Sequence, residues 1–347
     1  MKKILLSILL STGIIAVKAQ PPTEFWGFTE KGGLGFGTIF KTDNNGTNQQ
    51  IAYRFNAATA GRNPDRNRFC EAANGKLYGV MEGGKYDNGI LVELDPVTHT
   101  LVKKIDFYKP LHGSSPNGLV KGPNGKLYGT MMNGVDVDHD SQGNLFEYDP
   151  ATNIFTTKLI FPGANDLYNP TGDMKLTSNG KFYITSWGSS TVCGIIAEYD
   201  PVTNTLTTKN TPFTSGENGC SPQGKLAETS NGKLYGIANW GGAIGGRGTL
   251  YEYDPVADTM IVKVRFDGSI PGESPFGGVE LGNDGVIYGT TMFGGTDNNG
   301  TLFKYDPATG TFTSILQFNR GTQGAEPYGG LLKASNGMLY GLNSEGG

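Results

Sequence analysis

The chain has 347 residues, of which 54 are Gly and 18 are Pro, and only 17% are charged. So many turn-forming residues argue against a helical protein, while 11% aromatic residues are too many for a disordered linker. A formal charge of -4 offers no basic surface to nucleic acid, so no nucleic-acid partner is expected. Three cysteines exclude a small disulfide-dense scaffold.

The first 19 residues are predicted to be a secretory signal peptide. Lys2 and Lys3 precede an apolar run at residues 4–17, and Ala19 provides the small residue that a cleavage site needs. A membrane anchor is the alternative, but a helix of 14 residues would span about 21 Å, short of a hydrocarbon core of about 30 Å. No later segment of the sequence is long and apolar enough to cross a bilayer. We therefore expect cleavage after Ala19 and a protein that is secreted or at the cell surface, with the periplasm as an alternative location.

One unit is repeated along the rest of the chain. Its marker is the motif N-G-K-L-Y-G at residues 74–79, which returns with small changes in the later copies. The aromatic residues of the copies are Trp26, Tyr78, Tyr128, Tyr183, Tyr235, Tyr288 and Tyr340. Successive aromatics are 50 to 55 residues apart, and a fixed period of this length is typical of propellers and solenoids.

Each copy contains four short β-prone runs. They are a Gly-rich run such as residues 327–332, an L-Y-G run such as 127–130, a run that ends in Y-D-P such as 301–307, and a fourth run such as 312–318. Asn-Gly connects the first two runs and is a strong hairpin signal. In the D-P-x-T turn, Asp accepts backbone hydrogen bonds, Pro fixes φ, and a late Asn or Gly takes a left-handed conformation. Four antiparallel strands in about 52 residues make one propeller blade.

The order of these motifs resembles two known repeat families. N-G-K-[LF]-Y, a Gly pair and Y-D-P-x-T-N resemble the kelch blade, and G-x-L-Y-G-T-T with G-T-L-F-x-Y-D-P resembles the GloVer-type tandem repeat of secreted bacterial proteins. The resemblance covers nearly all of the chain after residue 19 and implies an all-β propeller. It departs from kelch at the outer strand, where the usual Trp is replaced by Phe155, Leu206, Met260 or Phe312.

The kelch register places the four strands of a blade. It makes the Gly-rich run the inner strand a, and strands b, c and d follow outward. The a–b and c–d turns then lie on one face, here named the hairpin face. The b–c and d–a loops lie on the other, here named the loop face. From the repeat aromatic to the turn Asp the distance varies between 17 and 21 residues, so length variation gathers on the loop face, where function is expected.

The number of copies predicts how the propeller closes. The N-terminus supplies strands b, c and d, and five complete blades follow. We expect the last a strand, at residues 327–334, to join the N-terminal strands in a mixed sixth blade, which removes exposed sheet edges. A further b strand at residues 339–343 would then be surplus. Residues 20–347 are thus expected to form a single, monomeric propeller domain of six blades, incomplete at Gly347, where the other copies continue.

Three aromatic residues are candidates for ligand binding on the loop face. Trp187, Trp240 and Phe293 end strand b in three consecutive blades, just before the b–c loop. Aromatic rings in such a place stack on sugar rings or anchor protein partners. The alternative is packing between blades, since large aromatics are usually buried. Because the sequence shows no catalytic constellation, the favoured function is non-enzymatic binding of an extracellular glycan or protein.

The alternative function is that of an extracellular carbohydrate-active enzyme, a hydrolase, lyase or isomerase. It would need carboxylates of perturbed pKa at the mouth of the central axis. The inner-strand runs offer Asp173, Lys175, Lys225 and Glu280 as exceptions to their small or apolar pattern. The sequence shows no S-x-D-x-G-x-T-W sialidase box, and its three histidines support no nucleophile triad, so no catalytic residue is assigned.

Two of the three cysteines are expected to pair. Cys193 enters strand c from a b–c loop, and Cys220 belongs to the following d–a loop on the same face. In an oxidising compartment such a pair forms a disulfide, which would leave Cys70 unpaired.

The longest b–c loop is the candidate metal site. Asp136, Asp138 and Asp140 alternate along it, so three carboxylates can turn toward one point, and hard oxygen ligands of this kind suit Ca²⁺. Ser141 replaces the Gly of an EF-hand loop, and no flanking helices are predicted. A solvated acidic loop is the alternative interpretation.

The calcium hypothesis predicts a metal-dependent stability. Millimolar Ca²⁺ should raise the midpoint of thermal unfolding relative to a chelator, because an ion that binds only the folded state stabilises it. Asp138→Asn should reduce the shift. A midpoint that does not move, or a shift that survives Asp138→Asn, would mean that the segment is only an acidic loop.

Overall fold

The computed structural model describes residues 25–29, 38–43, 48–55, 69–135, 143–161, 169–187, 193–209, 213–243, 245–269, 271–333 and 337–345. The expected signal peptide at residues 1–19 and the expected calcium ligands Asp136, Asp138 and Asp140 lie outside these residues. Within the described part of the chain, no helix is long and apolar enough to span a membrane.

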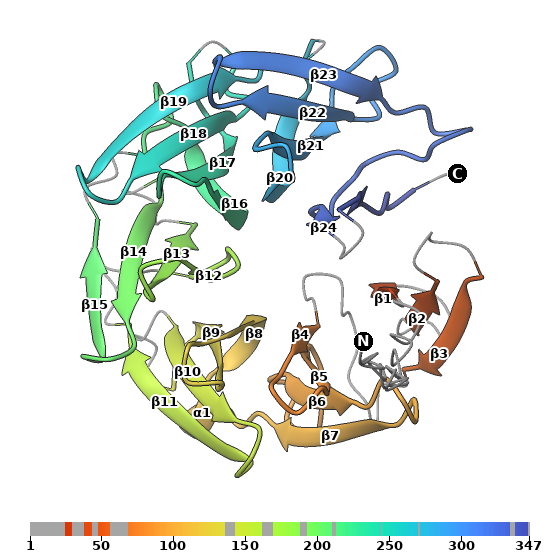
Figure 1. The fold of residues 1–347 in the computed structure, drawn as a ribbon, viewed down its shortest axis with the longest axis vertical. Coiled ribbons are helices and arrows are strands. Elements are labelled where there is room, and N and C mark those ends of the chain that lie inside the picture. Colours follow the sequence, from red (N-terminus) through yellow and green to blue (C-terminus); the bar gives the residue numbers. More distant parts are fainter. Residues whose placement is uncertain are drawn as a thin grey trace, which may run out of the picture.

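Short antiparallel strands form sheets that follow one another around a ring (Figure 1). The N-terminal sheet contains β1 (Phe25–Thr29), β2 (Thr38–Thr42) and β3 (Gln50–Arg54). Blade 1 contains β4 (Cys70–Glu71), β5 (Leu77–Met81), β6 (Ile90–Leu94) and β7 (Leu101–Asp106). Blade 2 contains β8 (Ser114–Lys121), β9 (Leu127–Asn133), β10 (Asn144–Asp149) and β11 (Ile154–Ile160). Blade 3 contains β12 (Lys175–Leu176), β13 (Phe182–Ser186), β14 (Ile195–Asp200) and β15 (Thr205–Thr208).

The second half of the ring continues the same pattern. Blade 4 contains β16 (Cys220–Glu228), β17 (Leu234–Trp240), β18 (Thr249–Asp254) and β19 (Thr259–Arg265). Blade 5 contains β20 (Glu273–Leu281), β21 (Ile287–Phe293), β22 (Thr301–Asp306) and β23 (Thr311–Gln317). The C-terminal sheet contains β24 (Leu332–Lys333) and β25 (Leu339–Tyr340). A parallel bridge between Lys225 and Gly278 joins blades 4 and 5 into one eight-stranded sheet.

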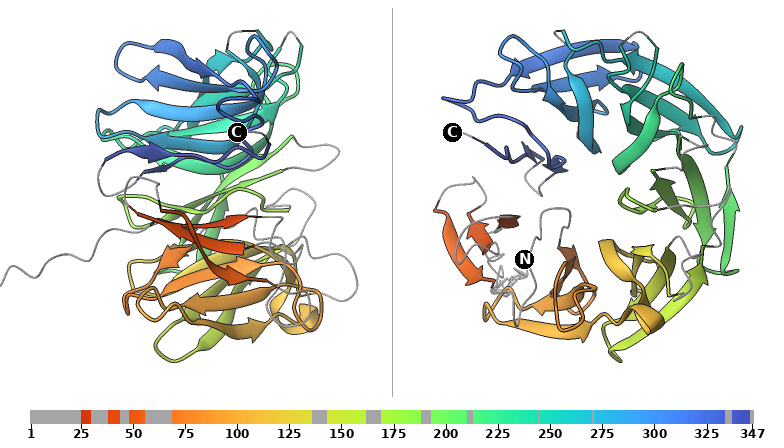
Figure 2. Two further views of the ribbon diagram at one scale, coloured as in Figure 1. Left: turned by 90° about the vertical axis from the view of Figure 1, so that its right-hand side faces the viewer. Right: turned by 180° about the vertical axis from the view of Figure 1, so that it is seen from behind.

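The strands of each complete blade are hydrogen-bonded in chain order, with the first nearest the axis and the fourth at the rim (Figure 1). This is the order a, b, c, d that the sequence predicts. The single-turn helix α1 (Lys109–His112) lies in the d–a loop before β8 and faces the viewer when the ring is seen from behind (Figure 2). Figure 1 therefore looks onto the hairpin face, and the loop face is the far side.

The Asp-Pro turns have the chemistry that the sequence predicts. Asp149 Oδ1 accepts a hydrogen bond of 2.9 Å from the Ala151 amide, and Asn153 adopts a φ of 59°. The Tyr148 hydroxyl, which is buried one residue before the turn, donates to Asn153 Oδ1 at 2.9 Å. His99 has a φ of 59° at the position of Asn153 in its own turn, so it is a turn residue as expected.

The hydrophobic core lies between blades rather than inside them. One cluster joins Tyr78 and Val80 of blade 1 to Phe146 and Tyr148 of blade 2, and Phe107 of the connecting loop is fully buried within it. The other clusters also draw on neighbouring sheets. Because a blade has apolar residues on both faces, it is stable only between two neighbours.

A backbone contact, here named the blade junction, recurs where successive blades meet on the loop face. In each of blades 1 to 5, a glycine at the end of the b–c loop has a φ between 94° and 132°. A Cβ on that glycine would lie 2.3–3.0 Å from Cδ of a proline that begins the next blade. The five junctions are Gly89 with Pro116, Gly143 with Pro170, Gly194 with Pro222, Gly248 with Pro275 and Gly300 with Pro327. Only glycine accommodates both the positive φ and the close approach.

The residue before each junction proline completes the contact. Its φ lies between 45° and 57°, although a residue before proline normally prefers an extended backbone. In blade 5, the Ser274 amide donates to the Arg247 carbonyl of blade 4 at 2.9 Å. Equivalent bonds of 2.7–3.1 Å run from Ser115 to Asn88, from Ser221 to Cys193 and from Glu326 to Asn299. The neighbouring blade therefore holds this unusual conformation in place.

The ends of the chain pair differently from the expectation. The sequence predicts that the last a strand joins the N-terminal strands in a mixed sixth blade. Instead, β24 pairs with β25, and Ala325 pairs with Glu345, while β1 to β3 pair only with one another among the described strands. The last a strand thus forms the same local hairpin as in the complete blades, and the edge that β1 would use is taken by β25. The mixed blade is not formed by the described strands, and the count of six blades stays a prediction.

The blade junction predicts which glycines cannot be replaced. A Cβ on Gly248 would lie within 2.6–2.8 Å of Pro275 Cδ and two backbone oxygens, whereas one on Gly245 of the same loop would meet nothing closer than 3.6 Å. Both residues have a positive φ, 103° and 91°. Gly245→Ala should cost about 1–2 kcal/mol of unfolding free energy from backbone strain, and Gly248→Ala about 3 kcal/mol because overpacking adds to it. If urea denaturation shows equal losses of unfolding free energy for the two variants, the blade junction does not have the role described here.

Candidate functional site

The polar residues that repeat in blades 1 to 4 are engaged in the fold. In blades 1 to 4 the repeat tyrosine donates its hydroxyl hydrogen to a glutamate of strand c. The pairs are Tyr78 with Glu93, Tyr128 with Glu147, Tyr183 with Glu198 and Tyr235 with Glu252. In blades 2 to 4 the Lys of N-G-K also donates to that glutamate, at 2.7–3.0 Å. Blade 5 departs from this pattern, because Lys304 replaces the glutamate and Tyr288 bonds Asp284.

These buried glutamates are ionised. Burial alone would raise the pKa of Glu147, Glu198 and Glu252, but the hydrogen bonds from Lys and Tyr outweigh it, so each pKa lies below its usual value. The motif N-G-K-L-Y is therefore a structural device. The residues that differ between copies are therefore the candidates for function.

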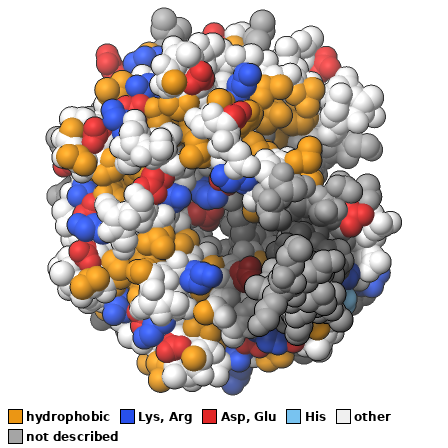
Figure 3. Space-filling view, in the orientation of Figure 1, with side chains coloured by type: hydrophobic (Ala, Val, Ile, Leu, Met, Phe, Trp, Pro, Cys, Tyr) orange, Lys and Arg blue, Asp and Glu red, His pale blue; other side chains and the backbone are white. Residues whose placement is uncertain are grey.

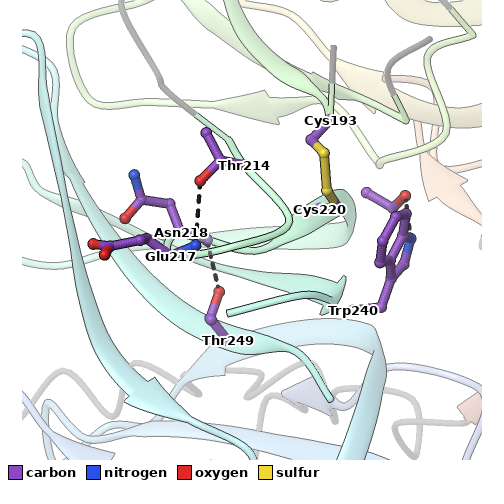
Figure 4. Close-up of a disulfide and its surroundings, with 8 residues drawn as sticks. Cys193, Thr214, Glu217, Asn218, Cys220, Trp240 and Thr249 are labelled. Atoms are coloured by element: carbon purple, nitrogen blue, oxygen red, sulfur yellow. Dashed lines mark hydrogen bonds between the residues drawn. A yellow bond between two sulfur atoms is a disulfide. The ribbon is translucent and has the colours of Figure 1, made fainter. Parts of the chain in front are cut away.

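Two such differences are exposed tryptophans on the loop face. Trp187 and Trp240 expose 48% and 45% of their surface, and Phe293 is half-buried. The Trp240 indole N–H donates to Ser221 Oγ at 2.8 Å, which holds the ring against the start of the same blade (Figure 4). The three aromatics occupy the ends of strand b in blades 3, 4 and 5. No ring contact joins them to each other within the described part of the chain.

A disulfide connects Cys193 and Cys220, the pair expected from the sequence (Figure 4). Their Cα atoms are 4.6 Å apart, and the bond links the b–c loop of blade 3 to the first strand of blade 4. Cys220 is directly opposite Trp240 in the pairing of β16 with β17. Cys70 is free, and burial raises the pKa of its thiol to about 11, so this cysteine is a poor nucleophile.

Hydrogen bonds hold residues 214–218, in the described part of the d–a loop of blade 4, close to this disulfide. The Glu217 amide donates to Thr214 Oγ1 at 3.3 Å, and Thr249 Oγ1 donates to the Asn218 carbonyl at 3.0 Å (Figure 4). The described part of the loop face between blades 3 and 4 thus combines a disulfide, a hydrogen-bonded tryptophan and a hydrogen-bonded segment at residues 214–218. Such a surface loses little conformational entropy when a ligand binds.

Of the histidines, His139 lies outside the described residues, His99 is the turn residue noted above, and His112 has a structural environment. His112 Nδ1 accepts a hydrogen bond of 2.9 Å from the Tyr108 amide, and its ring packs edge-on against Phe155 at 4.9 Å. Burial lowers the pKa of His112, so it is neutral at pH 7. In the part of the chain that the structure describes, no three His, Cys, Asp or Glu side chains are grouped to hold a metal ion.

The second group of differences lies at the axis. Glu280 of β20 is almost fully buried, and its Oε2 lies 2.5 Å from Nζ of Lys225 on β16. Two of the four exceptions in the sequence therefore converge, as a cation–carboxylate pair across two blades. Figure 3 shows the hairpin face hollowed at its centre, with Lys or Arg and Asp or Glu side chains along the described part of its rim.

Lys175 belongs to the same group. Burial lowers the pKa of its ammonium, as do the positive charges of Lys225 and Lys333, while Glu228 and Glu280 oppose this effect. The Oδ1 atom of Asp173 lies 2.8 Å from the place of a Cβ on Gly118, a residue of the inner strand β8 of blade 2. The sequence identified Lys175, Lys225 and Glu280 as exceptions to the small or apolar pattern of the inner strands, but it could not show which of their side chains form an ion pair.

The buried glutamates predict the response to acid. Because the pKa of Glu252 is lowered in the folded state, its contribution to stability is complete at neutral pH and is lost as the pH falls below its ordinary value of 4.5. Glu252→Gln should cost about 2 kcal/mol at pH 7, as expected for hydrogen bonds to a charged group, and should weaken the fall between pH 5 and pH 3.

Thermal unfolding at several pH values checks this expectation. Glu217→Gln is the matched control, since the exposed Glu217 side chain makes no hydrogen bond or ion pair among the described residues. If the melting temperature of Glu252→Gln falls with pH in parallel with that of the control, the assignment of Glu252 as an ionised, stabilising group is contradicted.

The fold resembles solved structures of low sequence identity. A putative 6-phosphogluconolactonase from Bacteroides fragilis is 15% identical at a TM-score of 0.57, with 92% of this chain and 87% of that chain covered. A nidogen–laminin complex gives 13% identity and a TM-score of 0.52, with 87% and 96% covered. These two likenesses show the β-propeller fold alone. The chain spans 61% of the length of TolB from Acinetobacter baumannii, with 83% of this chain covered, 15% identity and a TM-score of 0.48. A comparison with curated proteins found no match.

The repeat itself gives the family. Residues 15–183 and residues 139–347 each match the Gloeobacter/Verrucomicrobia repeat, and the two ranges together contain every copy of the motif. This agrees with the GloVer-type resemblance found in the sequence. The chain therefore belongs to the Gloeobacter/Verrucomicrobia repeat family.

Proposed function

We propose that this protein is a secreted or cell-surface β-propeller that binds an extracellular glycan or protein partner without catalysis. The binding surface is the loop face around Trp187 and Trp240. The observation that carries the proposal is that each of these tryptophans leaves nearly half of its surface in solvent. Exposed tryptophan is unusual on a surface without a partner, and it is the residue type most enriched at binding hot spots.

The surroundings of Trp240 support a binding role. Its indole N–H is already bonded to Ser221, and the residue opposite it in the sheet is part of the disulfide. The ring is therefore presented in one orientation, with an apolar face open for stacking. A preorganised aromatic of this kind favours affinity because little freedom remains to be lost.

The disulfide also supports an extracellular location. Disulfides persist in oxidising compartments, and the predicted signal peptide would deliver residues 20–347 there. The expected calcium site at Asp136, Asp138 and Asp140 is part of the proposal, because by sequence it belongs to a b–c loop of the same face.

A second candidate function is that of an extracellular carbohydrate-active enzyme with its chemistry at the axial mouth. The observation that favours it is the convergence of Glu280 and Lys225 next to Lys175, whose pKa is lowered. Perturbed groups of this kind gather at active sites. Hydrolysis by two carboxylates is the less suitable chemistry, because Glu280 is paired with Lys225 and Glu228 accepts hydrogen bonds from Ser178. A base-catalysed lyase or isomerase reaction is the better match.

The binding proposal predicts that the two tryptophans matter for affinity and little for folding. On an array of glycans and extracellular proteins, Trp187→Ala or Trp240→Ala should weaken the strongest signal at least tenfold, as expected for loss of a hot spot of about 2 kcal/mol. The melting temperature should stay within a few degrees, because both rings are half exposed.

Trp240→Phe is the matched variant, since it keeps an aromatic face but loses the hydrogen bond to Ser221. It should retain part of the binding. If the alanine variants bind normally, or if they lose about 3–5 kcal/mol of stability, the tryptophans serve packing instead.

A further inference from the structure

A second exposed group of apolar side chains lies on the loop face, between blades 1 and 2. Tyr86 belongs to the b–c loop of blade 1, and Tyr108 and Leu111 belong to the d–a loop that contains α1 (Figure 2). The two tyrosine rings are in contact, with their centroids 5.0 Å apart. Tyr86, Tyr108 and Leu111 leave 44%, 43% and 65% of their surface in solvent. These three side chains are here named the tyrosine patch.

The b–c loop of blade 1 has the same framework as that of blade 5. Residues 83–89 and 294–300 both begin with a Gly pair and end with the junction glycine. In both loops the last amide donates to the first carbonyl, at 2.9 and 3.1 Å. The third amide donates to a side chain at the end of strand d, at 2.8 and 2.6 Å. Tyr86 and Asp297 therefore occupy the same position in two equivalent loops.

The d–a loops that follow these two blades are also equivalent. The first residue of each turn is Tyr108 or Asn319, eight residues before the junction proline. Its amide donates to the side chain four residues later, at 2.9 and 3.1 Å, and its carbonyl accepts the amide hydrogen of that same residue, at 2.9 Å in both. Leu111 and Thr322 stand three residues after the first residue and are therefore equivalent as well.

In blade 5 the equivalent residues are polar and bond each other. Asn319 Nδ2 donates to Asp297 Oδ2 at 3.0 Å, between the same two loop positions that the tyrosine rings join in blade 1. The same framework thus accepts a polar pair, so the fold does not require the aromatic pair. Three polar residues of one copy are replaced by two aromatic residues and a leucine in the other.

Tyr108 also breaks a capping rule that other copies keep. It is the N-cap residue of α1, but its side chain makes no capping hydrogen bond. At the equivalent position, Thr214, Asp267 and Asn319 each accept a hydrogen bond from a backbone amide two or three residues later, at 2.9–3.3 Å. Tyr is therefore the less favourable residue for the turn itself. A residue that breaks a local rule without a gain for the fold is expected at a functional site.

The chemistry of the patch favours a protein partner over a glycan. A glycan needs polar side chains that bond its hydroxyl groups, and the polar residues of the blade 5 copy are the ones replaced here. Lys85 Nζ lies 4.9 Å from the centre of the Tyr86 ring, so this ring is not an open platform for a sugar. Aromatic and aliphatic side chains with a charge at their edge are typical of protein interfaces.

The charges around the patch indicate what the partner places there. Lys85 forms no ion pair within the described part of the chain, whereas the neighbouring Glu82 and Asp87 have interactions of their own. A carboxylate of the partner would complement the Lys85 ammonium. Three side chains are too few for a stable interface, which needs about 800 Å² from each partner. The partner must therefore also cover other parts of the loop face, which carries Trp187 and Trp240.

We propose that the tyrosine patch is a docking site for a protein partner. The partner buries Tyr86, Tyr108 and Leu111 in an apolar contact and places a carboxylate beside Lys85. This inference rests on the binding role proposed for the loop face and selects a protein as the partner there. The exposed tryptophans of blades 3 and 4 form the second part of the same interface.

Transfer of the blade 5 residues into the patch tests the proposal. The triple variant combines Tyr86→Asp, Tyr108→Asn and Leu111→Thr. On an array of purified extracellular proteins and glycans, the strongest wild-type signal should come from a protein, and the triple variant should weaken it at least tenfold. The melting temperature should rise by about 2 °C, because the cap and the polar pair are restored.

Two further variants separate the patch from a general surface effect. Lys85→Glu should weaken the same signal several-fold at low ionic strength and less at high ionic strength, because the lost attraction is electrostatic. Val97→Thr is the matched control and should bind normally, since Val97 is an exposed apolar residue of the same blade on the hairpin face.

Trp240→Ala distinguishes this proposal from the binding function itself. If Trp240→Ala weakens binding and the triple variant does not, the docking site is overturned while the binding function stands. If neither variant weakens binding, both proposals fall. The docking site is also overturned if no protein on the array binds the wild type, if the strongest signal comes from a glycan, or if the triple variant melts several degrees lower, which would mean that the tyrosines serve packing.

Discussion

The junction between blades is the constraint on which the ring and its loop face depend. A glycine at positive φ lies against the first proline of the next blade, and the residue before that proline donates its amide hydrogen back across the gap. Neither part of this contact is favourable alone. A positive φ before proline is strained, and a buried carbonyl needs a hydrogen-bond donor. Because the contact recurs between successive blades, it fixes the spacing at which the apolar faces pack. It also fixes the loops that carry Trp187, Trp240 and the disulfide.

Repetition separates structure from function in this chain. Residues that recur in most copies have a structural explanation, as in the buried bonds of Tyr128 and Tyr235 to glutamates of strand c. Residues that break the repeat gather in two places, on the loop face and at the axis. The exposed Trp240 is unfavourable for an isolated propeller because it exposes apolar surface, and a ligand on the loop face would relieve that cost.

The sequence predicted local features better than contacts between copies. The order of strands, the Asp-Pro turns and the left-handed Asn153 follow from short motifs, because their chemistry is completed within a few residues. The Tyr–Glu bonds and the Lys225–Glu280 pair were not foreseen, since they join strands or blades whose register only the folded ring defines. The pairing of β24 with β25 was missed for a related reason: the local hairpin forms more readily than a contact between the chain ends.

Amide hydrogen exchange at the blade junctions tests the account most directly. The amides of Ser115, Ser274 and Glu326 donate to the preceding blade, although Ser115 and Ser274 lie at the first, loop-face ends of β8 and β20 and Glu326 lies before β24. If the junctions hold the ring together, these amides should exchange only through global unfolding, as slowly as those in the central strands. The Val256 amide, which is bonded within an exposed turn, provides the fast reference. Junction amides that exchange as fast as Val256 would contradict the claim that these contacts fix the blades and the loop face.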